Sequence, residues 1–161
     1  EVVVNPIKNE KFLKEIFENS LFFWTDVTRN SAHILQEQKN NTDQNFKNLM
    51  EIKTLAKDLI KLTGNGFSIS KFGEILDKSW RIKRKLSKRI SNNKFDKLYS
   101  LAKKNGALGG KILGAGGGGF FLIIAKKVDQ KRIIDSFTSC KRVDFSYEEK
   151  GSQVIYNNVN Q

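Results

Sequence analysis

Residues 106–120 read Gly-Ala-Leu-Gly-Gly-Lys-Ile-Leu-Gly-Ala-Gly-Gly-Gly-Gly-Phe, and this stretch decides the fold because it joins a helix to an apolar strand. Residues 95–104 have a helical pattern that ends at Asn105 and Gly106. Residues 120–125 form an apolar run that is typical of a buried strand. A backbone with so few Cβ atoms can turn sharply and let another chain or a phosphate approach closely. The glycines therefore indicate either close packing or ligand contact.

Two nucleotide-binding motifs match this stretch only in part. Residues 114–119 satisfy G-x-G-x-x-G, but that motif follows a strand and opens a helix, whereas this stretch follows a helix and opens a strand. A Walker A loop would need Gly in place of Asn105, and Ser or Thr in place of Ile112. We expect neither motif. A purely structural role, in which the glycines let a helix pack closely on a sheet, stays open.

The glycine-rich stretch resembles the third signature motif of the GHMP kinases, a family that includes galactokinase, homoserine kinase and mevalonate kinase. Residues 76–87 and 21–32 resemble segments of the branch of heptose 7-phosphate kinases and fucokinases. That branch usually reads Tyr-Thr-Gly-x-x-Arg-x-Ala in the second segment, and this chain keeps Thr25 and Arg29. At the positions of the Tyr, the Gly and the Ala of that motif, this chain has Trp24, Asp26 and Ser31. Since Asp tolerates turn geometry, we expect the fold to be kept.

The resemblance implies one α+β domain over residues 1–161, similar to the ferredoxin-like carboxy-terminal domain of the family, with an antiparallel or mixed sheet and helices on one face. In these kinases the amino-terminal half carries a Pro-x-x-x-Gly-Leu-Gly-Ser-Ser phosphate loop and the catalytic acid or base. No such segment occurs in these residues, which begin without Met. We therefore expect an amino-terminal ATP-binding domain to precede this chain, and we expect no catalytic residue in the chain itself.

The resemblance also implies an activity, namely transfer of the ATP γ-phosphate to a hydroxyl of a heptose 7-phosphate or related sugar. ATP and magnesium would be bound mainly by the amino-terminal domain, so this chain alone would be inactive. Its glycine loop would approach the phosphate loop of that domain. The residues concerned are Gly109, Gly110, Lys111, Gly114, Ala115, Gly116, Gly117, Gly118 and Gly119.

Lys83 stands out in a basic segment because it falls on an apolar stripe. A helix over residues 72–90 would align Phe72, Leu76, Trp80, Leu86 and Ile90. A buried ammonium without a partner is costly, so Lys83 either binds an anion or extends along Trp80 to reach water. Given the resemblance, we expect Lys83 to contact a substrate phosphate or sugar hydroxyl and the Trp80 ring to pack on a sugar. The extended conformation that reaches water stays open.

Arg29 presents a similar choice. Residues 21–25 have a strand pattern and residues 28–38 a helical one, which would place Arg29 at the start of a helix. A helix start favours anions, and Arg adds a planar, two-pronged donor. We therefore expect Arg29 to bind substrate, while an ion pair with Asp26 remains a structural alternative.

Composition limits the remaining possibilities. The chain has 161 residues, 39% of them hydrophobic, which is enough for one core, and no apolar run approaches a membrane span. The single Cys cannot form an internal disulfide, and the single His disfavours a metal site. Because a chain without disulfides is compatible with a reducing compartment, the cytoplasm is the expected location. A formal charge of +12 is compatible with a nucleic-acid-binding module, but the aromatic residues at 120–121 lie in an apolar run rather than among basic residues. A regulatory domain of kinase fold is a third hypothesis.

Lys and Arg elsewhere are expected to form a solvated surface, with Arg81, Lys85 and Lys88 on the side of their helix away from the apolar stripe. The remaining expected elements follow from apolar periodicity. We expect strands at residues 2–4, 142–147 and 153–156, the last two joined by a turn at 149–151, and helices at residues 9–19, 45–63 and 129–139.

Overall fold

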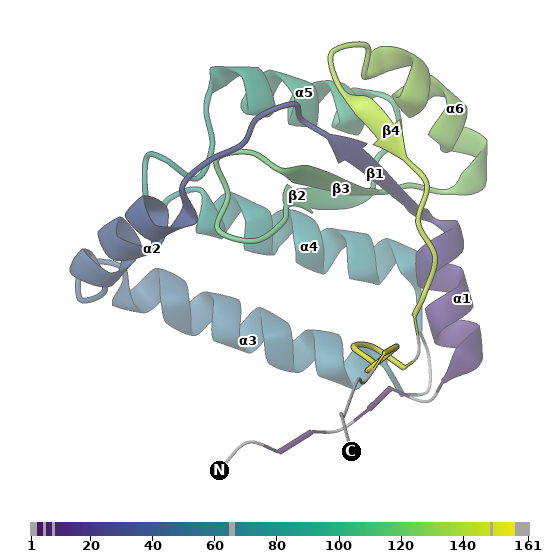
Figure 1. The fold of residues 1–161 in the computed structure, drawn as a ribbon, viewed down its shortest axis with the longest axis horizontal. Helices are drawn as coiled ribbons and strands as arrows, with labels where there is room; N and C mark the ends of the chain where they lie inside the picture. Colours follow the sequence, from purple (N-terminus) through teal and green to yellow (C-terminus); the bar gives the residue numbers. More distant parts are fainter. Residues whose placement is uncertain (1–2, 5, 8, 65–66, 149, 157–161) are drawn as a thin grey trace.

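The computed structural model describes residues 3–4, 6–7, 9–64, 67–148 and 150–156. Figure 1 shows a small sheet with helices packed around it. In chain order the elements are α1 (Glu10–Glu18), β1 (Ser20–Trp24), α2 (Ser31–Asn40), α3 (Phe46–Leu62), α4 (Ile69–Lys83), α5 (Asn93–Lys104), β2 (Gly109–Ile112), β3 (Phe120–Ile124), α6 (Lys127–Ser136) and β4 (Lys141–Val143).

Side-chain caps fix the starts of several helices. The side chains of Asn9, Asn30 and Asn92 each accept a backbone N–H from the first turn of α1, α2 and α5. Asn is among the best N-cap residues because its oxygen satisfies a donor that the helix leaves free. The helices expected at residues 9–19, 45–63 and 95–104 are confirmed as α1, α3 and α5 within two residues at each end.

The sheet is antiparallel throughout, with strand order β2-β3-β1-β4. Phe23 lies opposite Phe121 and Leu21 opposite Ile123, so these four side chains share one face of the sheet. All four are buried, in one cluster with Trp80 of α4 and with residues of α5 and α6. This face supplies the main core, and the architecture is the expected α+β class.

The glycine-rich stretch contains a strand that the sequence pattern did not predict. Residues 106–119 had been expected to form a loop, but residues Gly109–Ile112 pair with β3 as strand β2. Gly109 and Gly110 hide the usual alternation of strands because they carry no side chain. Pairing with β3 and packing against α4 make this segment a strand.

The helices α2, α4 and α6 differ from the expected ranges. Helix α2 begins at Ser31 rather than at residue 28, because Asn30 caps it. Helix α4 ends at Lys83, and residues 84–90 form turns instead of the helix expected to residue 90. Like charges three and four residues apart in this basic segment disfavour a helix. Helix α6 spans Lys127–Ser136 instead of residues 129–139.

The chain ends contain less strand than expected. Strand β4 covers only Lys141–Val143, and the described residues 153–156 are exposed and form no strand. Val3 and Val4 are also outside any strand, while Val2 and Glu149 lie outside the described residues. Of the expected strand, helix and strand unit at the amino terminus, the helix and the second strand are present as α1 and β1, and only the first strand is absent at Val3 and Val4.

Candidate functional site

The loop between β2 and β3, residues 113–119, is held against this chain's own backbone. Its glycines with positive φ are Gly114, Gly116, Gly117, Gly118 and Gly119. The Gly117 N–H donates to the Ile90 carbonyl at 2.8 Å, and the Gly119 N–H donates to the Val27 carbonyl at 2.9 Å. A Cβ atom at Gly118 would lie 2.7 Å from the Val27 oxygen. The bare backbone is thus used to pack the loop onto residues 27–29 and 89–90.

Glycines outside the loop serve a different contact. A Cβ atom at Gly109 would lie 1.9 Å from the carbonyl oxygen of Gly73, so strand β2 touches helix α4 backbone to backbone. Gly110 is equally enclosed, with the Leu122 oxygen 2.4 Å from the position of a Cβ atom. Gly109 thus shows the close helix-to-sheet packing that is one of the alternatives for the glycine-rich stretch, whereas Gly110 is enclosed by the neighbouring strand β3.

Arg29 lies within the curve of the loop. It precedes the cap of α2, so it is not at the helix start where the sequence pattern placed it. Its Nη2 donates to the Leu113 carbonyl at 3.3 Å. A Cβ atom at Gly119 would lie 2.9 Å from Nη1, and one at Gly114 would lie 3.1 Å from Nη2. The Arg29 Nε is buried and has no hydrogen-bond partner among the described residues.

Asp26 does not form the ion pair with Arg29 that was the structural alternative; no such pair occurs among the described residues. Its carboxylate instead accepts from Trp24 Nε1 at 3.4 Å. Its φ is 56°, in the left-handed region. Asp occupies the position where the resembled branch usually has Gly, and it tolerates this conformation better than most residues.

Lys83 is the last residue of α4 and points at the glycine loop. Its Nζ donates to the Gly114 carbonyl at 2.5 Å. Burial lowers the pKa of Lys83 to about 8, with further contributions from the charges of Lys111 and Arg29. Burial also lowers the pKa of Lys111, which lies on β2. Lys83 therefore neither reaches freely into water nor meets a carboxylate, and its neighbours are cations.

These three side chains, Arg29, Lys83 and Lys111, form what we call the cation cluster. Within the described part of the chain, none of them forms an ion pair with Asp or Glu. They come from three segments, the stretch before α2, the end of α4 and strand β2. Mutual repulsion of like charges in a partly buried place is unfavourable unless an anion binds there. The cluster is therefore a candidate anion site.

A cleft of about 390 Å³ opens beside the cation cluster. It is lined by Arg29, Ser31, Leu35, Gln38, Lys83, Gly114 and Ala115. Gln38 Nε2 is buried and lacks a hydrogen-bond partner among the described residues. The sequence pattern does not predict Leu35 and Gln38 as site residues. They lie on a polar helix, and the pattern of that helix does not indicate that the glycine loop packs beside it. Cationic, amide and hydroxyl donors on one wall can bind the oxygens of a phosphate ester.

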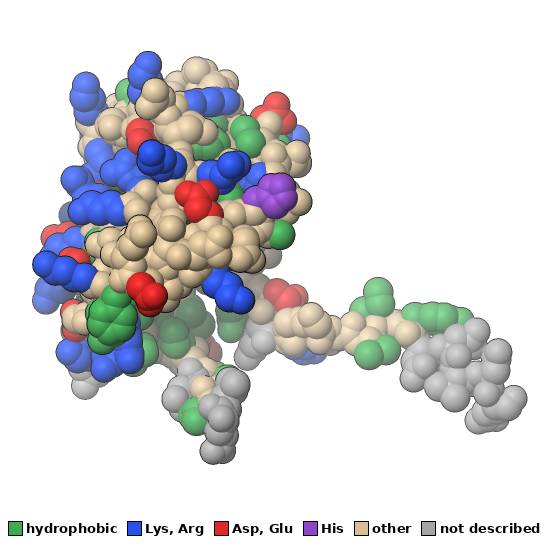
Figure 2. Space-filling model, turned by 90° about the vertical axis from the view of Figure 1, so that its left-hand side faces the viewer, with side chains coloured by type: hydrophobic (Ala, Val, Ile, Leu, Met, Phe, Trp, Pro, Cys, Tyr) green, Lys and Arg blue, Asp and Glu red, His purple; other side chains and the backbone are tan. Residues whose placement is uncertain are grey.

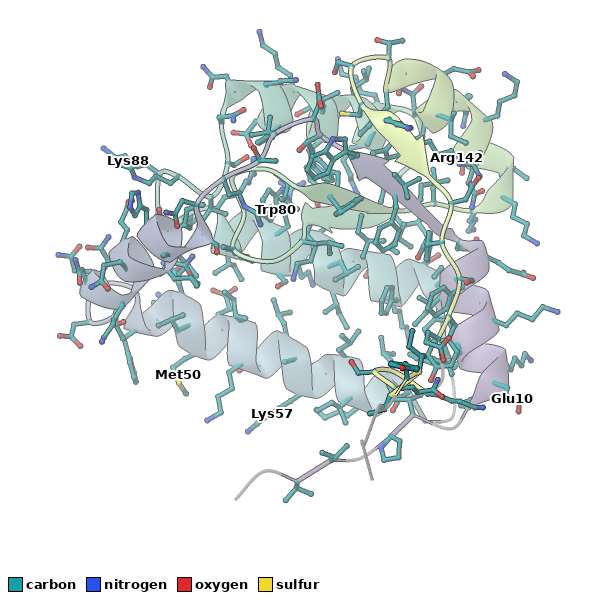
Figure 3. All side chains as sticks on the ribbon, viewed as in Figure 1. Glu10, Met50, Lys57, Trp80, Lys88 and Arg142 are labelled. Atoms are coloured by element: carbon teal, nitrogen blue, oxygen red, sulfur yellow. The ribbon has the colours of Figure 1, made fainter. Side chains whose placement is uncertain are left out.

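Trp80 must be removed from the expected substrate contacts. Its side chain is 1% exposed and its ring centroid lies 6.3 Å from that of Phe121. Figure 3 shows it in the middle of the molecule beside the sheet, whereas Lys88 is at the periphery. The ring therefore has no free face on which a sugar could pack. The apolar stripe that suggested a ligand contact is the side of α4 that faces the core.

The remaining basic residues behave as a solvated surface. Lys and Arg side chains gather over one side of the view in Figure 2. Arg81, Lys85 and Lys88 are exposed, as expected, and Arg81 pairs with Asp77 at 2.9 Å. Their charge is thus partly balanced and faces water, unlike that of the cation cluster.

Neither a metal site nor a membrane helix is found in the described part of the chain. No group of three or more His, Cys, Asp or Glu residues there could hold a metal ion. No helix within the same residues is long and apolar enough to cross a membrane. The cleft presents cations and an amide rather than the carboxylates that magnesium prefers, so its residues do not fit a magnesium site.

The chain is similar in sequence to known sugar kinases. The chain is 30% identical over 155 residues to the D-glycero-alpha-D-manno-heptose 7-phosphate kinase of Campylobacter jejuni, covering 93% of this chain and 45% of that protein. It is 25% identical over 137 residues to the bifunctional fucokinase/GDP-fucose pyrophosphorylase of Arabidopsis thaliana, covering 81% of this chain and 12% of that protein. The chain thus spans less than half the length of these curated relatives.

The fold is shared with solved kinases. The crystal structure of a D-glycero-D-manno-heptose 1-phosphate kinase from Bacteroides thetaiotaomicron matches with a TM-score of 0.60 at 18% identity, covering 89% of this chain and 37% of that one. The family model described as GHMP kinases C terminal matches residues 55–142, more than half of this chain. The chain therefore belongs to the GHMP kinase carboxy-terminal domain family.

Proposed function

We propose that this chain is the carboxy-terminal domain of an ATP-dependent kinase whose substrate is a heptose 7-phosphate or a related sugar phosphate. An amino-terminal domain of the same polypeptide would bind ATP and magnesium. The family match and the similarity to a heptose 7-phosphate kinase support a sugar kinase. A cytoplasmic location agrees with a reaction that consumes ATP.

The cation cluster is the observation that carries the choice of a phosphorylated sugar. The curated relatives include kinases named for a sugar phosphate and for fucose, which carries no phosphate. A neutral sugar would leave Arg29, Lys83 and Lys111 without a counter-charge. A phosphate monoester carries close to two negative charges at neutral pH and would balance much of this charge. The cleft therefore fits a sugar that already bears a phosphate.

The residues of the cleft would act by positioning. Arg29 would hold two phosphate oxygens at once, because its guanidinium is planar and two-pronged, and Lys83 would add a point charge. Anchoring one end of the sugar would direct a distant hydroxyl towards ATP. That hydroxyl oxygen would bond to the γ-phosphorus while the bond between this phosphorus and the β–γ bridging oxygen breaks. The hydroxyl proton would pass to a base of the amino-terminal domain, and ADP would leave. Such transfer depends mainly on positioning and charge stabilisation, so this chain needs no acid or base of its own.

The glycine loop would complete this arrangement. Gly114 and Ala115 line the cleft. The next residue, Gly116, packs closely against the turn that contains Ile90. A loop fixed in this way would keep the wall of the cleft rigid when a ligand binds. Contact of the same loop with the phosphate loop of the amino-terminal domain is part of the proposal.

The test is to purify the complete polypeptide and measure ATP-dependent phosphorylation of heptose 7-phosphate, unphosphorylated heptose and fucose. We expect transfer to heptose 7-phosphate. Lys83→Ala should raise the KM for heptose 7-phosphate about 10–100-fold, which is the range expected for loss of a charged hydrogen bond. The KM for ATP should be unchanged. Lys88→Ala, at the exposed end of the same basic segment, is the matched control.

Two results would contradict the proposal. Equal activity on fucose and heptose 7-phosphate would show that the cation cluster does not select a phosphate. Absence of transfer to every sugar by a folded, complete protein would favour a regulatory domain of kinase fold.

A further inference from the structure

Among the lysines that the structure describes, Lys83 is distinguished by the position of its side-chain amine. It lines the 390 Å³ cleft, so a small molecule in that cleft can reach it. Its hydrogen bond is to the neutral carbonyl oxygen of Gly114 and not to a carboxylate. An amine that donates a proton to a carbonyl still has its lone pair available when it is neutral. The Lys83 amine is thus accessible from the cleft and has no carboxylate partner.

The surroundings of Lys83 raise the share of that neutral form relative to an exposed lysine. Burial and the nearby charges of Lys111 and Arg29 all disfavour the ammonium ion, and they lower the pKa of Lys83 to about 8. No acidic group contributes to this shift. A lysine placed in a partly buried site beside another cation is a recognised arrangement for an activated amine nucleophile.

The same neighbours would bring a suitable electrophile to the amine. The Arg29 guanidinium remains a cation when Lys83 is neutral, and it attracts a phosphate group. Arg29 lines the same cleft as Lys83. A molecule that carries both a phosphate and an aldehyde would therefore be held with its carbonyl carbon near Nζ. Holding two reacting groups together in this way raises their effective concentration.

We propose that Lys83 is a modification site, at which the side-chain amine forms a Schiff base with aldehydes that carry a phosphate group. Nζ adds to the aldehyde carbon, and its C=O bond becomes a C–OH group as a proton moves from nitrogen to oxygen. The resulting carbinolamine loses water and leaves a C=N bond. The step is reversible and needs no oxidant, reductant or further reactant. It does not depend on the proposed kinase activity.

The other lysines that the argument must consider within the described residues lack one or more of these conditions. Lys85 and Lys88 are exposed and do not line the cleft. Lys111 is half-buried, but it is not among the lining residues. Lys103 donates to the Leu108 carbonyl on another side of the fold. The modification should therefore be selective for Lys83.

The probe for the test is pyridoxal 5′-phosphate, an aldehyde that carries a phosphate. The purified protein is incubated with a limiting amount near neutral pH, the imine is reduced with borohydride, and peptides are mapped by mass spectrometry. We expect Lys83 to be labelled about ten times faster than Lys88, because its surroundings raise the share of neutral amine. Inorganic phosphate in excess should suppress this labelling.

Two matched controls make the outcome decisive. Pyridoxal has the same aldehyde without the phosphate and should label Lys83 more slowly than pyridoxal 5′-phosphate does. Lys83→Arg keeps the charge but cannot form the imine, so it should lose the fast-labelled peptide while its circular dichroism stays unchanged. Labelling spread evenly over exposed lysines, or equal labelling of Lys83 by pyridoxal, would overturn the proposal. Labelling at Lys83 that excess phosphate does not suppress would also overturn it.

Discussion

Glycine serves two purposes in this chain, and the two regions that use it differ in what surrounds them. In the interior, Gly73 and Gly109 let helix α4 and strand β2 meet backbone to backbone, and neither has a positive φ. In the loop at residues 113–119, Gly114 and Gly116 have positive φ and border the segments that carry Arg29 and Ile90. The first region requires glycine because no Cβ atom fits, and the second requires it also for its backbone conformation.

The largest effect is expected in the interior region. Gly109→Ala would place a Cβ atom 1.9 Å from the Gly73 carbonyl oxygen and 3.0 Å from the Asp77 nitrogen, both of which are backbone atoms. Neither atom can move without shifting α4, so we expect a loss of more than about 3 kcal/mol in the free energy of unfolding. Urea denaturation followed by circular dichroism measures it. Gly64→Ala is the control, because its nearest contact would be 3.6 Å away. Equal stability of the two variants would mean that α4 and β2 do not pack this closely.

Smaller effects are expected in the loop, and they should differ between two positions. Gly116 has a φ of 96° and a Cβ atom there would lie 2.8 Å from the Ile90 oxygen, so Gly116→Ala combines strain with a backbone clash. Gly114 has a φ of 67° and would meet only Arg29 Nη2, at 3.1 Å. We expect losses of about 3 and about 1 kcal/mol respectively, since a left-handed conformation costs an alanine about 1–2 kcal/mol. The urea midpoints of the two variants show which substitution costs more stability. A larger loss for Gly114→Ala than for Gly116→Ala would contradict the loop geometry.

The smallest effect concerns pH and the cation cluster. The pKa of Lys83 is lowered from 10.5 to about 8 in the folded protein. Between these values the unfolded chain binds the proton and the folded protein does not, so this lysine's contribution to stability rises as pH increases from about 8 to 10.5. Below that window Lys83 is charged in both states and the cost of burying its charge is present in full.

The variant Lys83→Met removes this contribution. Relative to it, the unmodified protein should become more stable between pH 8 and pH 10.5, and the difference should be constant below pH 8. Urea midpoints of both proteins across this range give the comparison, and Lys88→Met at an exposed site is the control. A difference that is independent of pH would mean that the pKa of Lys83 is not lowered in the folded protein.

Much of the fold follows from local patterns. Apolar spacing places α1, α3 and α5 within two residues of their observed ends. The apolar run that begins at Phe120 is strand β3. The same reasoning failed for β2, whose glycines hide the strand pattern, and for the end of α4, where the apolar stripe continues through residues that form turns. The periodicity of a side-chain pattern does not distinguish a helix from a turn that buries the same residues.

The candidate site was found only in part. Arg29 and Lys83, each predicted to contact substrate, line one cleft in the folded chain, and Gly114 and Ala115 line it as well. Trp80 was placed in the site because it neighbours Lys83 on the helix, but it faces the core. The contact of Lys111 with this group depends on the register of β2, which the sequence pattern did not predict.

The order of the amino acids was sufficient for the family, for most helices and for the position of the glycine loop, because caps, periodicity and motifs act over a few neighbouring residues. The arrangement of the cation cluster required the folded chain. Arg29, Lys83 and Lys111 are far apart in the sequence, and they meet because the loop curves back onto residues 27–29 while α4 packs against β2. Distances between such segments depend on packing and strand register, to which every part of the core contributes.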